Sequence, residues 1–188
     1  MKNNSREPIN VAQFGVGYWG PNLLRNLISN PRFNVRTVVD LSETRRDFVT
    51  SLYPGISVDS TPEVVFENPN IDAVVIATPV ATHYDLAIRA VKSGKHVLVE
   101  KPMATRVEDV KNIGRVATEK NVTAMVGHTF LFNQAVRYVK GLIDGGDLGD
   151  IRYIYSQRVN LGRIRNDVDA LWNLAPHDVS IIQYWLGD

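Results

Sequence analysis

A glycine-rich turn between a short apolar run and a helix most constrains what this chain can fold into. The run 11–14 is followed by three glycines that fit the pattern G-x-G-x-x-G: Gly15, Gly17 and Gly20. In such a turn the first glycine permits a tight bend, the second lets a pyrophosphate approach the backbone, and the third lets the helix pack close to the strand. A helix is predicted from Trp19 to about Asn30, and its N-terminus would offer free N–H groups to phosphates.

The next predicted strand indicates that the phosphates bound at the turn belong to a dinucleotide. Phe33–Val39 is predicted to be a strand, and it ends at Asp40, twenty residues after Gly20. A carboxylate at this distance accepts hydrogen bonds from an adenine ribose and repels a 2′-phosphate. The sequence therefore predicts an NAD site, with the backbone amides of Tyr18 and Trp19 beside the phosphates.

Strand and helix patterns alternate through the first two thirds of the chain. Apolar runs at 71–77, 96–99 and 123–126 are typical of buried parallel strands, and segments with helical spacing lie between them. This alternation predicts an α/β fold with a doubly wound parallel sheet. We therefore expect an NAD-binding Rossmann domain over residues 1–127.

The pattern changes after this point. Apolar spacing predicts an amphipathic helix over 132–143, alternating side chains predict a longer strand over 151–159, and a further helix is expected over 169–186. One strand cannot form a sheet, so its partners belong either to another chain or to a longer protein of which this sequence is a piece. We expect the latter, with residues 128–188 as the first part of an incomplete second domain.

Composition excludes several classes of function. A net charge of +1 predicts no attraction to nucleic acid or to anionic membranes. The absence of cysteine excludes disulfides, thiolate catalysis and cysteine metal sites, and the four dispersed histidines predict no metal site. The polar segment 1–8 is not a signal peptide and no run is long enough to cross a bilayer, so we expect a soluble, cytoplasmic protein.

Motifs after the later strands carry a family resemblance. They are Val74-Val75-Ile76-Ala77-Thr78-Pro79, Thr82-His83, Gly94-Lys95-His96-Val97 and Glu100-Lys101-Pro102. With the glycine turn they resemble the glucose-fructose oxidoreductase / inositol dehydrogenase / MocA family, of which the E-K-P tripeptide is the best marker. The resemblance implies a nucleotide-binding domain followed by an α/β domain with an open antiparallel sheet that commonly forms the oligomer interface. It implies as partners a small sugar or nucleotide-sugar substrate and further copies of the same chain.

Lys101 is the first catalytic candidate. Ligands of open α/β sheets sit at the carboxyl ends of strands, where Glu100 and Lys101 lie. An ammonium group near a nicotinamide ring can hold a substrate hydroxyl and stabilise an alkoxide. From spacing alone, a surface lysine before a proline turn is the alternative. The resemblance favours the functional role, with Glu100 positioning the lysine or the ring.

His177 is the second catalytic candidate. An imidazole suits general acid/base chemistry on an alcohol–ketone couple. Asn173 lies four residues earlier and shares a helix face with His177 if both are helical. Many members of the family have Asp at the Asn173 position, so a carboxylate-tuned base is in doubt here, although Asn can hydrogen-bond a substrate hydroxyl. A histidine that caps a helix is the alternative, and the adjacent Asp178 either orients the imidazole or is structural.

The remaining candidates each have a structural alternative. Thr78 and Pro79 either run past the cofactor, as the resemblance implies, or form a plain turn. His83 either binds the cofactor or begins a helix. His128 either borders the site or packs as a structural histidine.

Three residues of the second half complete the set of candidates. Arg163 and Arg165 could hold a substrate phosphate or carboxylate by bidentate contacts, or could belong to a solvated loop. Trp172 either packs on the cofactor or lies in the core.

Together these residues predict an NAD-dependent sugar or polyol dehydrogenase, in which His177, with Lys101, takes the hydroxyl proton while hydride passes to nicotinamide C4. The run Asn160-Leu161-Gly162-Arg163 and the segment 172–178 look most similar to dehydrogenases that oxidise C3 of nucleotide-linked N-acetyl sugars or uronic acids. An inositol or polyol dehydrogenase and a non-catalytic NAD-binding regulatory protein are the alternatives. The presence of both Lys101 and His177 argues against the regulatory protein.

Overall fold

The computed structural model describes residues 7–159 and 169–187. The chain divides into two compact units, Met1–Val126 and Gly127–Asp188, and each is described by itself. Arg163 and Arg165 lie outside the described residues, so their roles stay predictions.

The first unit is a six-stranded parallel sheet with helices between its strands. In sheet order the strands are β3 (Ser57–Asp59), β2 (Phe33–Val39), β1 (Ile9–Phe14), β4 (Ala73–Ile76), β5 (His96–Val99) and β6 (Ala124–Val126). The connecting helices are α1 (Gly20–Ser29), α2 (Glu43–Leu52), α3 (Glu63–Phe66), α4 (His83–Lys92) and α5 (Val107–Glu119), with a 3₁₀ turn η1 (Val80–Thr82) before α4. The strand order 3-2-1-4-5-6 is that of a doubly wound dinucleotide-binding sheet, so the predicted Rossmann fold is confirmed.

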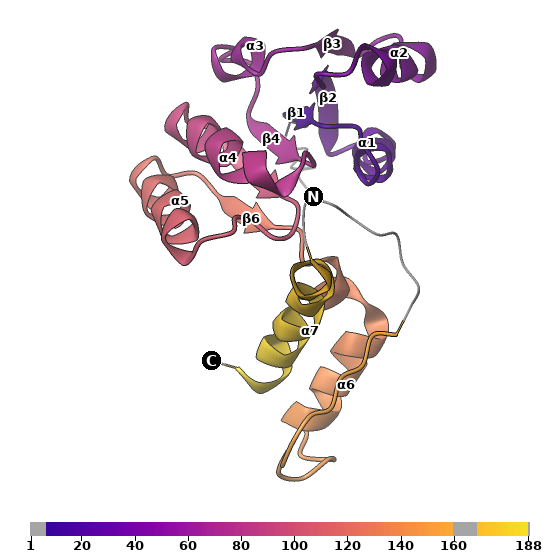
Figure 1. The fold of residues 1–188 in the computed structure, drawn as a ribbon, viewed down its shortest axis with the longest axis vertical. Coiled ribbons are helices and arrows are strands. Elements are labelled where there is room, and N and C mark those ends of the chain that lie inside the picture. The colour runs from indigo at the N-terminus through magenta and orange to yellow at the C-terminus, as the bar shows by residue number, and fades with distance from the viewer. Residues whose placement is uncertain (1–6, 160–168, 188) are drawn as a thin grey trace, which may run out of the picture. The chain divides into compact units, whose positions relative to one another are not determined.

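Helices cover both faces of this sheet, with α1 and α2 on one side and α4 and α5 on the other (Figure 1). A small core on the α1 and α2 side is formed by Val16, Leu24, Val35, Val38 and Val49. A larger core on the other side includes Phe14, Ile76 and Ile113, which are almost completely buried. The last four residues of β1 are all buried, because this strand runs through the middle of the sheet with helices above and below it.

The described part of the second unit contains a 3₁₀ turn, η2 (Thr129–Phe132), and two helices, α6 (Gln134–Asp144) and α7 (Ala170–Leu186). The indole N–H of Trp185 donates to the carbonyl oxygen of Val136 at 2.9 Å, which joins α7 to α6. The Lys140 ammonium group donates in turn to the Trp185 carbonyl oxygen at 3.1 Å. The helix expected over 169–186 is present as α7, and it is capped by Asp169, whose Oδ1 accepts the N–H of Trp172 at 2.8 Å.

The segment 151–159 forms no strand in the structure, so the predicted strand is wrong. A strand is stable only when a neighbour pairs with its backbone, and no strand of the described residues pairs with this segment. Its alternating side chains therefore define no buried face: Tyr153 and Tyr155 are 85% and 78% exposed. The antiparallel sheet that the family resemblance implies is not present among the described residues.

The described ranges contain neither a membrane-spanning helix nor a cluster of metal-binding side chains. No helix in 7–159 or 169–187 is long and apolar enough to cross a membrane. Within the same residues, no group of three or more His, Asp or Glu side chains is arranged to hold a metal ion.

Candidate functional site

The glycine turn lies where the strand order of the sheet reverses. The N–H of Gly15 donates to the carbonyl oxygen of Val39 at 2.8 Å, on the β2 side. On the other side, the N–H of Ala77 donates to the carbonyl oxygen of Phe14 at 2.8 Å. The turn is thus held between the carboxyl ends of β2 and β4, which is where doubly wound sheets bind their ligands.

The three glycines of the turn have different surroundings. Gly15 has a φ of +86°, and a Cβ there would come within 2.7 Å of the Ala77 carbonyl oxygen. A Cβ on Gly20 would collide with the carbonyl group of Gly15. At Gly17, by contrast, no atom beyond its chain neighbours lies within 4 Å of a Cβ position among the described residues. The first and third glycines are therefore required by the turn itself, while Gly17 leaves open space that fits the approach of a pyrophosphate.

The side chain of Gln13, in β1, makes hydrogen bonds to this turn. Its side chain is completely buried, and its Nε2 donates to the carbonyl oxygens of Gly15 and Gly20, both at 2.9 Å. Its Oε1 accepts no hydrogen bond from the described residues. Sequence reasoning missed this residue, although one polar residue inside the apolar strand 11–14 was a signal that could have identified it.

Asp40 is tied to the same turn. Its Oδ2 accepts the N–H of Val16 at 2.9 Å, and its Oδ1 accepts the N–H of Ser42 at 2.9 Å. Each carboxylate oxygen can accept a second hydrogen bond, so Asp40 can still bind ribose hydroxyls in this position. The side chain therefore has a structural role at the turn besides the role predicted from its spacing.

Glu100 and Lys101 follow β5 at the same end of the sheet. The N–H of Glu100 donates to the carbonyl oxygen of Ile76 at 2.9 Å, and Glu100 Oε2 accepts the N–H of Lys101 at 3.2 Å. Burial raises the pKa of Glu100, and hydrogen bonds from the Lys101 backbone and the Trp19 side chain, with the Lys101 charge, partly oppose this rise.

His83 is the first residue of α4, and its ring joins two loops. The side chain is buried, with 2% of the residue exposed. Nδ1 lies 2.8 Å from the carbonyl oxygen of Pro102, and Nε2 lies 2.9 Å from the carbonyl oxygen of Thr78. This arrangement holds protein loops together and presents neither ring nitrogen to a ligand.

In the second unit, His177 lies in α7 beside an aromatic and charged cluster. Its ring centroid is 4.7 Å from that of Phe130, and the Arg158 guanidinium lies 4.9 Å from the Phe130 ring centroid. Arg158 Nε donates to Asp178 Oδ2 at 2.7 Å. This hydrogen bond is the main reason that the pKa of Asp178 lies below its ordinary value, and the charges of Arg158 and His177 act in the same direction. Asp178 is therefore paired with Arg158, a partner that the sequence did not indicate.

The other predicted residues of this unit are placed as follows. Asn173 and His177 are both in α7, four residues apart, so they share one side of the helix. Trp172 is 41% exposed near the start of α7 and belongs to neither buried cluster of the described residues. His128 lines an open depression together with Leu131, Ser180, Gln183, Tyr184 and Gly187.

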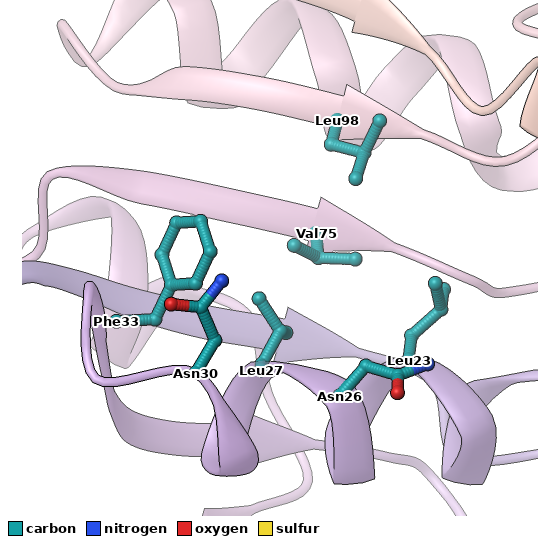
Figure 2. Close-up of a pocket in the computed structure, with 7 residues that line it drawn as sticks. All are labelled: Leu23, Asn26, Leu27, Asn30, Phe33, Val75 and Leu98. Atoms are coloured by element: carbon teal, nitrogen blue, oxygen red, sulfur yellow. The ribbon is translucent and has the colours of Figure 1, made fainter. Parts of the chain in front are cut away.

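A small apolar pocket on the α1 side of the sheet is separate from these residues. Figure 2 shows Leu23 and Leu27 of α1 pointing toward Val75 of β4 and Leu98 of β5. Asn26, Asn30 and Phe33 complete the lining. The pocket contains none of the predicted site residues, so it is a packing gap between helix and sheet and not the cofactor site.

Comparison with known proteins identifies the family. The family described as "Oxidoreductase family, NAD-binding Rossmann fold" matches residues 9–128. The chain belongs to this family, that of glucose-fructose oxidoreductase, inositol dehydrogenase and MocA, and its first unit is the NAD-binding Rossmann domain.

Several relatives are known by name. The scyllo-inositol 2-dehydrogenase (NAD(+)) of Bacillus subtilis is 30% identical over 185 residues, which are 95% of this chain and 54% of the relative. The scyllo-inositol 2-dehydrogenase (NADP(+)) IolW of the same organism is 30% identical over 165 residues, 86% of this chain and 45% of the relative. The crystal structure of GenD2 from gentamicin A biosynthesis, in complex with NAD, has a TM-score of 0.84 at 24% identity, over 97% of this chain and 54% of that chain, and shows the shared fold. The chain thus spans about half the length of the relatives that it matches.

Proposed function

We propose that the protein carrying this chain is an NAD-dependent oxidoreductase that oxidises a secondary hydroxyl group of a sugar. The observation that carries the proposal is the position of the glycine turn, Asp40 and the Glu100–Lys101 loop at the carboxyl ends of β1, β2 and β5 in one parallel sheet. The two named relatives that act on scyllo-inositol support oxidation of a CH–OH group. Within this class we propose C3 of a nucleotide-linked N-acetyl sugar or uronic acid as the reacting centre.

The residues around the turn fit the predicted cofactor. NAD supplies the hydride acceptor when bound. The open space at Gly17 would hold its pyrophosphate, and the second acceptor positions on the Asp40 carboxylate would bind the adenine ribose. The charge of Asp40 favours NAD over NADP, because a 2′-phosphate would face a carboxylate. Thr78 and Pro79, in the loop after β4, are proposed to line the same cofactor.

The chain's own groups would act on the hydroxyl as follows. The Lys101 ammonium group would hold the substrate oxygen and stabilise the negative charge that develops on it. Glu100 would position this lysine through the hydrogen bond from the Lys101 N–H to its Oε2. His177 is proposed to accept the hydroxyl proton on a ring nitrogen, and Asn173 to hydrogen-bond a neighbouring hydroxyl.

Residues 128–188 are proposed to belong to the domain that binds the substrate and forms the oligomer interface. Arg163 and Arg165 are proposed to bind a phosphate or carboxylate of the substrate there. On this proposal the complete protein is needed for turnover, and the 188-residue chain alone binds NAD without oxidising a sugar.

The test is an assay of the complete protein with NAD and a panel of nucleotide sugars and free polyols, followed by the absorbance of NADH. Turnover of a nucleotide-linked N-acetyl sugar or uronic acid is expected. Turnover of only a free polyol such as inositol would overturn the choice of substrate and favour the polyol dehydrogenase that the scyllo-inositol relatives suggest. Binding of NAD without turnover of any member of the panel would favour the regulatory protein.

A further inference from the structure

We propose that His83 is a positioning residue that fixes Lys101 relative to the cofactor by joining the loop after β4 to the loop after β5. This inference rests on the proposed function, because it gives Lys101 a reacting partner. It concerns a residue that touches neither substrate nor cofactor in the proposed mechanism.

The first observation is the pair of contacts made by the His83 ring. Nδ1 lies 2.8 Å from the carbonyl oxygen of Pro102, the residue directly after Lys101. Nε2 lies 2.9 Å from the carbonyl oxygen of Thr78, the second residue after β4. Both distances are those of good hydrogen bonds, and the ring is buried, so water does not replace either contact.

The second observation is the chemistry of the two partners. A carbonyl oxygen only accepts hydrogen bonds, and a neutral imidazole carries a hydrogen on only one ring nitrogen, so the ring donates to both carbonyl groups together only as the imidazolium. In either form, His83 has one ring nitrogen within hydrogen-bond distance of each loop. Because the two nitrogens are fixed in one rigid ring, the separation of the two carbonyl groups is fixed as well.

The third observation is the position of the two loops. The loop after β4 lies against the glycine turn, because a Cβ on Gly15 would be 2.7 Å from the Ala77 carbonyl oxygen and 3.0 Å from Thr78 Cγ2. The loop after β5 carries Lys101. His83 therefore connects the backbone that surrounds the phosphate site to the backbone that carries the proposed catalytic ammonium group.

A second set of contacts holds the same loop at Glu100. The N–H of Glu100 donates to the carbonyl oxygen of Ile76, the last residue of β4, at 2.9 Å, and Glu100 Oε2 accepts the Lys101 N–H at 3.2 Å. The lysine loop is thus held at Glu100 through β4 and at Pro102 through His83. Lys101 lies between these two points, and catalytic groups must be held within about 0.5 Å of their productive position.

A purely structural histidine would behave differently from a positioning residue. If His83 only stabilised the fold, its loss would lower the melting temperature and leave the kinetics of the folded enzyme unchanged. If it positions Lys101, its loss lowers kcat in protein that is still folded at the assay temperature, because a displacement of about 1 Å can reduce a rate by roughly 100-fold.

Two conservative substitutions in the complete protein separate the two contacts. In His83→Asn the amide nitrogen takes the place of Nδ1 and can still donate to Pro102. In His83→Gln the amide nitrogen takes the place of Nε2 and can still donate to Thr78. His83→Ala removes both donors, and the first two variants keep the test usable if the alanine variant does not fold.

We expect the glutamine variant to lose the lysine-side contact, so kcat at saturating NAD falls roughly 10-fold to 100-fold while the affinity for NAD is kept. The asparagine variant loses the cofactor-side contact, so its KM and Kd for NAD rise about fivefold, the equivalent of one hydrogen bond, while kcat changes less than in the glutamine variant. The matched control is His96→Ala. His96 Nδ1 accepts the N–H of Thr123 at 2.9 Å, and His96 is the first residue of β5, at the opposite end of the strand from the loop that carries Lys101. This control should keep wild-type kcat and KM.

Wild-type kcat and Kd for NAD in both the asparagine and the glutamine variant would overturn the inference. The proposed function is tested separately, by the turnover of the wild-type protein in the same assay. If the wild type turns over no substrate, the proposed function fails, and the Kd for NAD still decides the inference: weaker binding in the asparagine than in the glutamine variant supports it, and equal binding overturns it.

Discussion

The backbone N–H of Val16 donates to Oδ2 of Asp40 at 2.9 Å, so the carboxylate that is proposed to bind the adenine ribose also holds the glycine turn. The two residues are 24 positions apart in the sequence and follow neighbouring strands. The proposed recognition of the ribose and the observed shape of the glycine turn therefore depend on one side chain.

Asp40→Asn removes the charge and keeps one oxygen that can accept the Val16 N–H, whereas its amide nitrogen cannot accept the Ser42 N–H that Asp40 Oδ1 accepts. We expect the affinity for NADP to rise relative to that for NAD by roughly tenfold, because the 2′-phosphate no longer meets a negative charge. Titration of the protein with each cofactor measures the ratio. The matched control is Glu43→Gln, which removes the same charge from the first turn of α2, and an equal ratio in both variants would contradict a specific role for Asp40.

Gln13→Met keeps a similar side-chain volume and removes both donors to Gly15 and Gly20. Two buried carbonyl groups then lose a hydrogen bond, and we expect the free energy of unfolding to fall by about 1–3 kcal/mol and NAD to bind more weakly. Urea denaturation and a cofactor titration measure these effects. Gln134→Met at the exposed start of α6 is the control, and the prediction is wrong if both variants lose the same stability.

Glu100→Gln removes a carboxyl group whose pKa burial raises. Below pH 4.5, the ordinary pKa of a glutamate, Glu100 is protonated in both the folded and the unfolded state and has no effect. As the pH rises, the unfolded state releases its proton first, so the wild type loses stability until the pH passes the raised pKa of the folded state. We therefore expect the stability gained by Glu100→Gln to increase from acidic to neutral pH, as measured by denaturation at several pH values.

The stability of Glu63→Gln relative to the wild type is expected to change with pH in the opposite direction. The hydrogen bond from Arg89 lowers the pKa of Glu63, so its stabilisation is present above pH 4.5 and is lost as the pH falls through the lowered pKa. The glutamine variant should therefore become less stable than the wild type as the pH rises. Parallel curves for the two variants would contradict the assignment for Glu100.

Lys101→Met tests the proposed catalytic role directly. Without the ammonium group the charge on the substrate oxygen is not stabilised, so we expect kcat of the complete protein to fall by about 100-fold or more while the Kd for NAD stays close to that of the wild type. Lys111→Met in α5 removes an equal charge outside the site and should leave kcat unchanged. An unchanged rate in Lys101→Met would favour a binding-only protein.

Local sequence patterns predicted much of the first unit. The predicted limits of β2 and β5 coincide with those of the structure, because each apolar run ends there at a polar residue. The segment 151–159 has an equally clear alternation and forms no strand, because strand pairing is a property of two segments and its partner is not among the described residues.

The candidate site also has features that the sequence predicted and contacts that it did not predict. The glycine spacing, Asp40 and the E-K-P tripeptide could be read from the sequence because each is a short run of residues at fixed distances. Two other contacts could not be read from the sequence: that of Gln13 with Gly20 and that of Arg158 with Asp178. The partners are 7 and 20 residues apart, and their contact depends on how the segments fold against each other.

The sequence by itself determined that this protein contains an NAD-binding Rossmann domain, since the turn, the alternating strands and helices and the family motifs are all local features. Only the tertiary structure decided how the site is held: His83 reaches Pro102, 19 residues away, because the parallel order of β4 and β5 brings the ends of both strands to the same edge. A buried ring nitrogen must be satisfied by whichever carbonyl group the fold places within reach, and the sequence does not specify that distance.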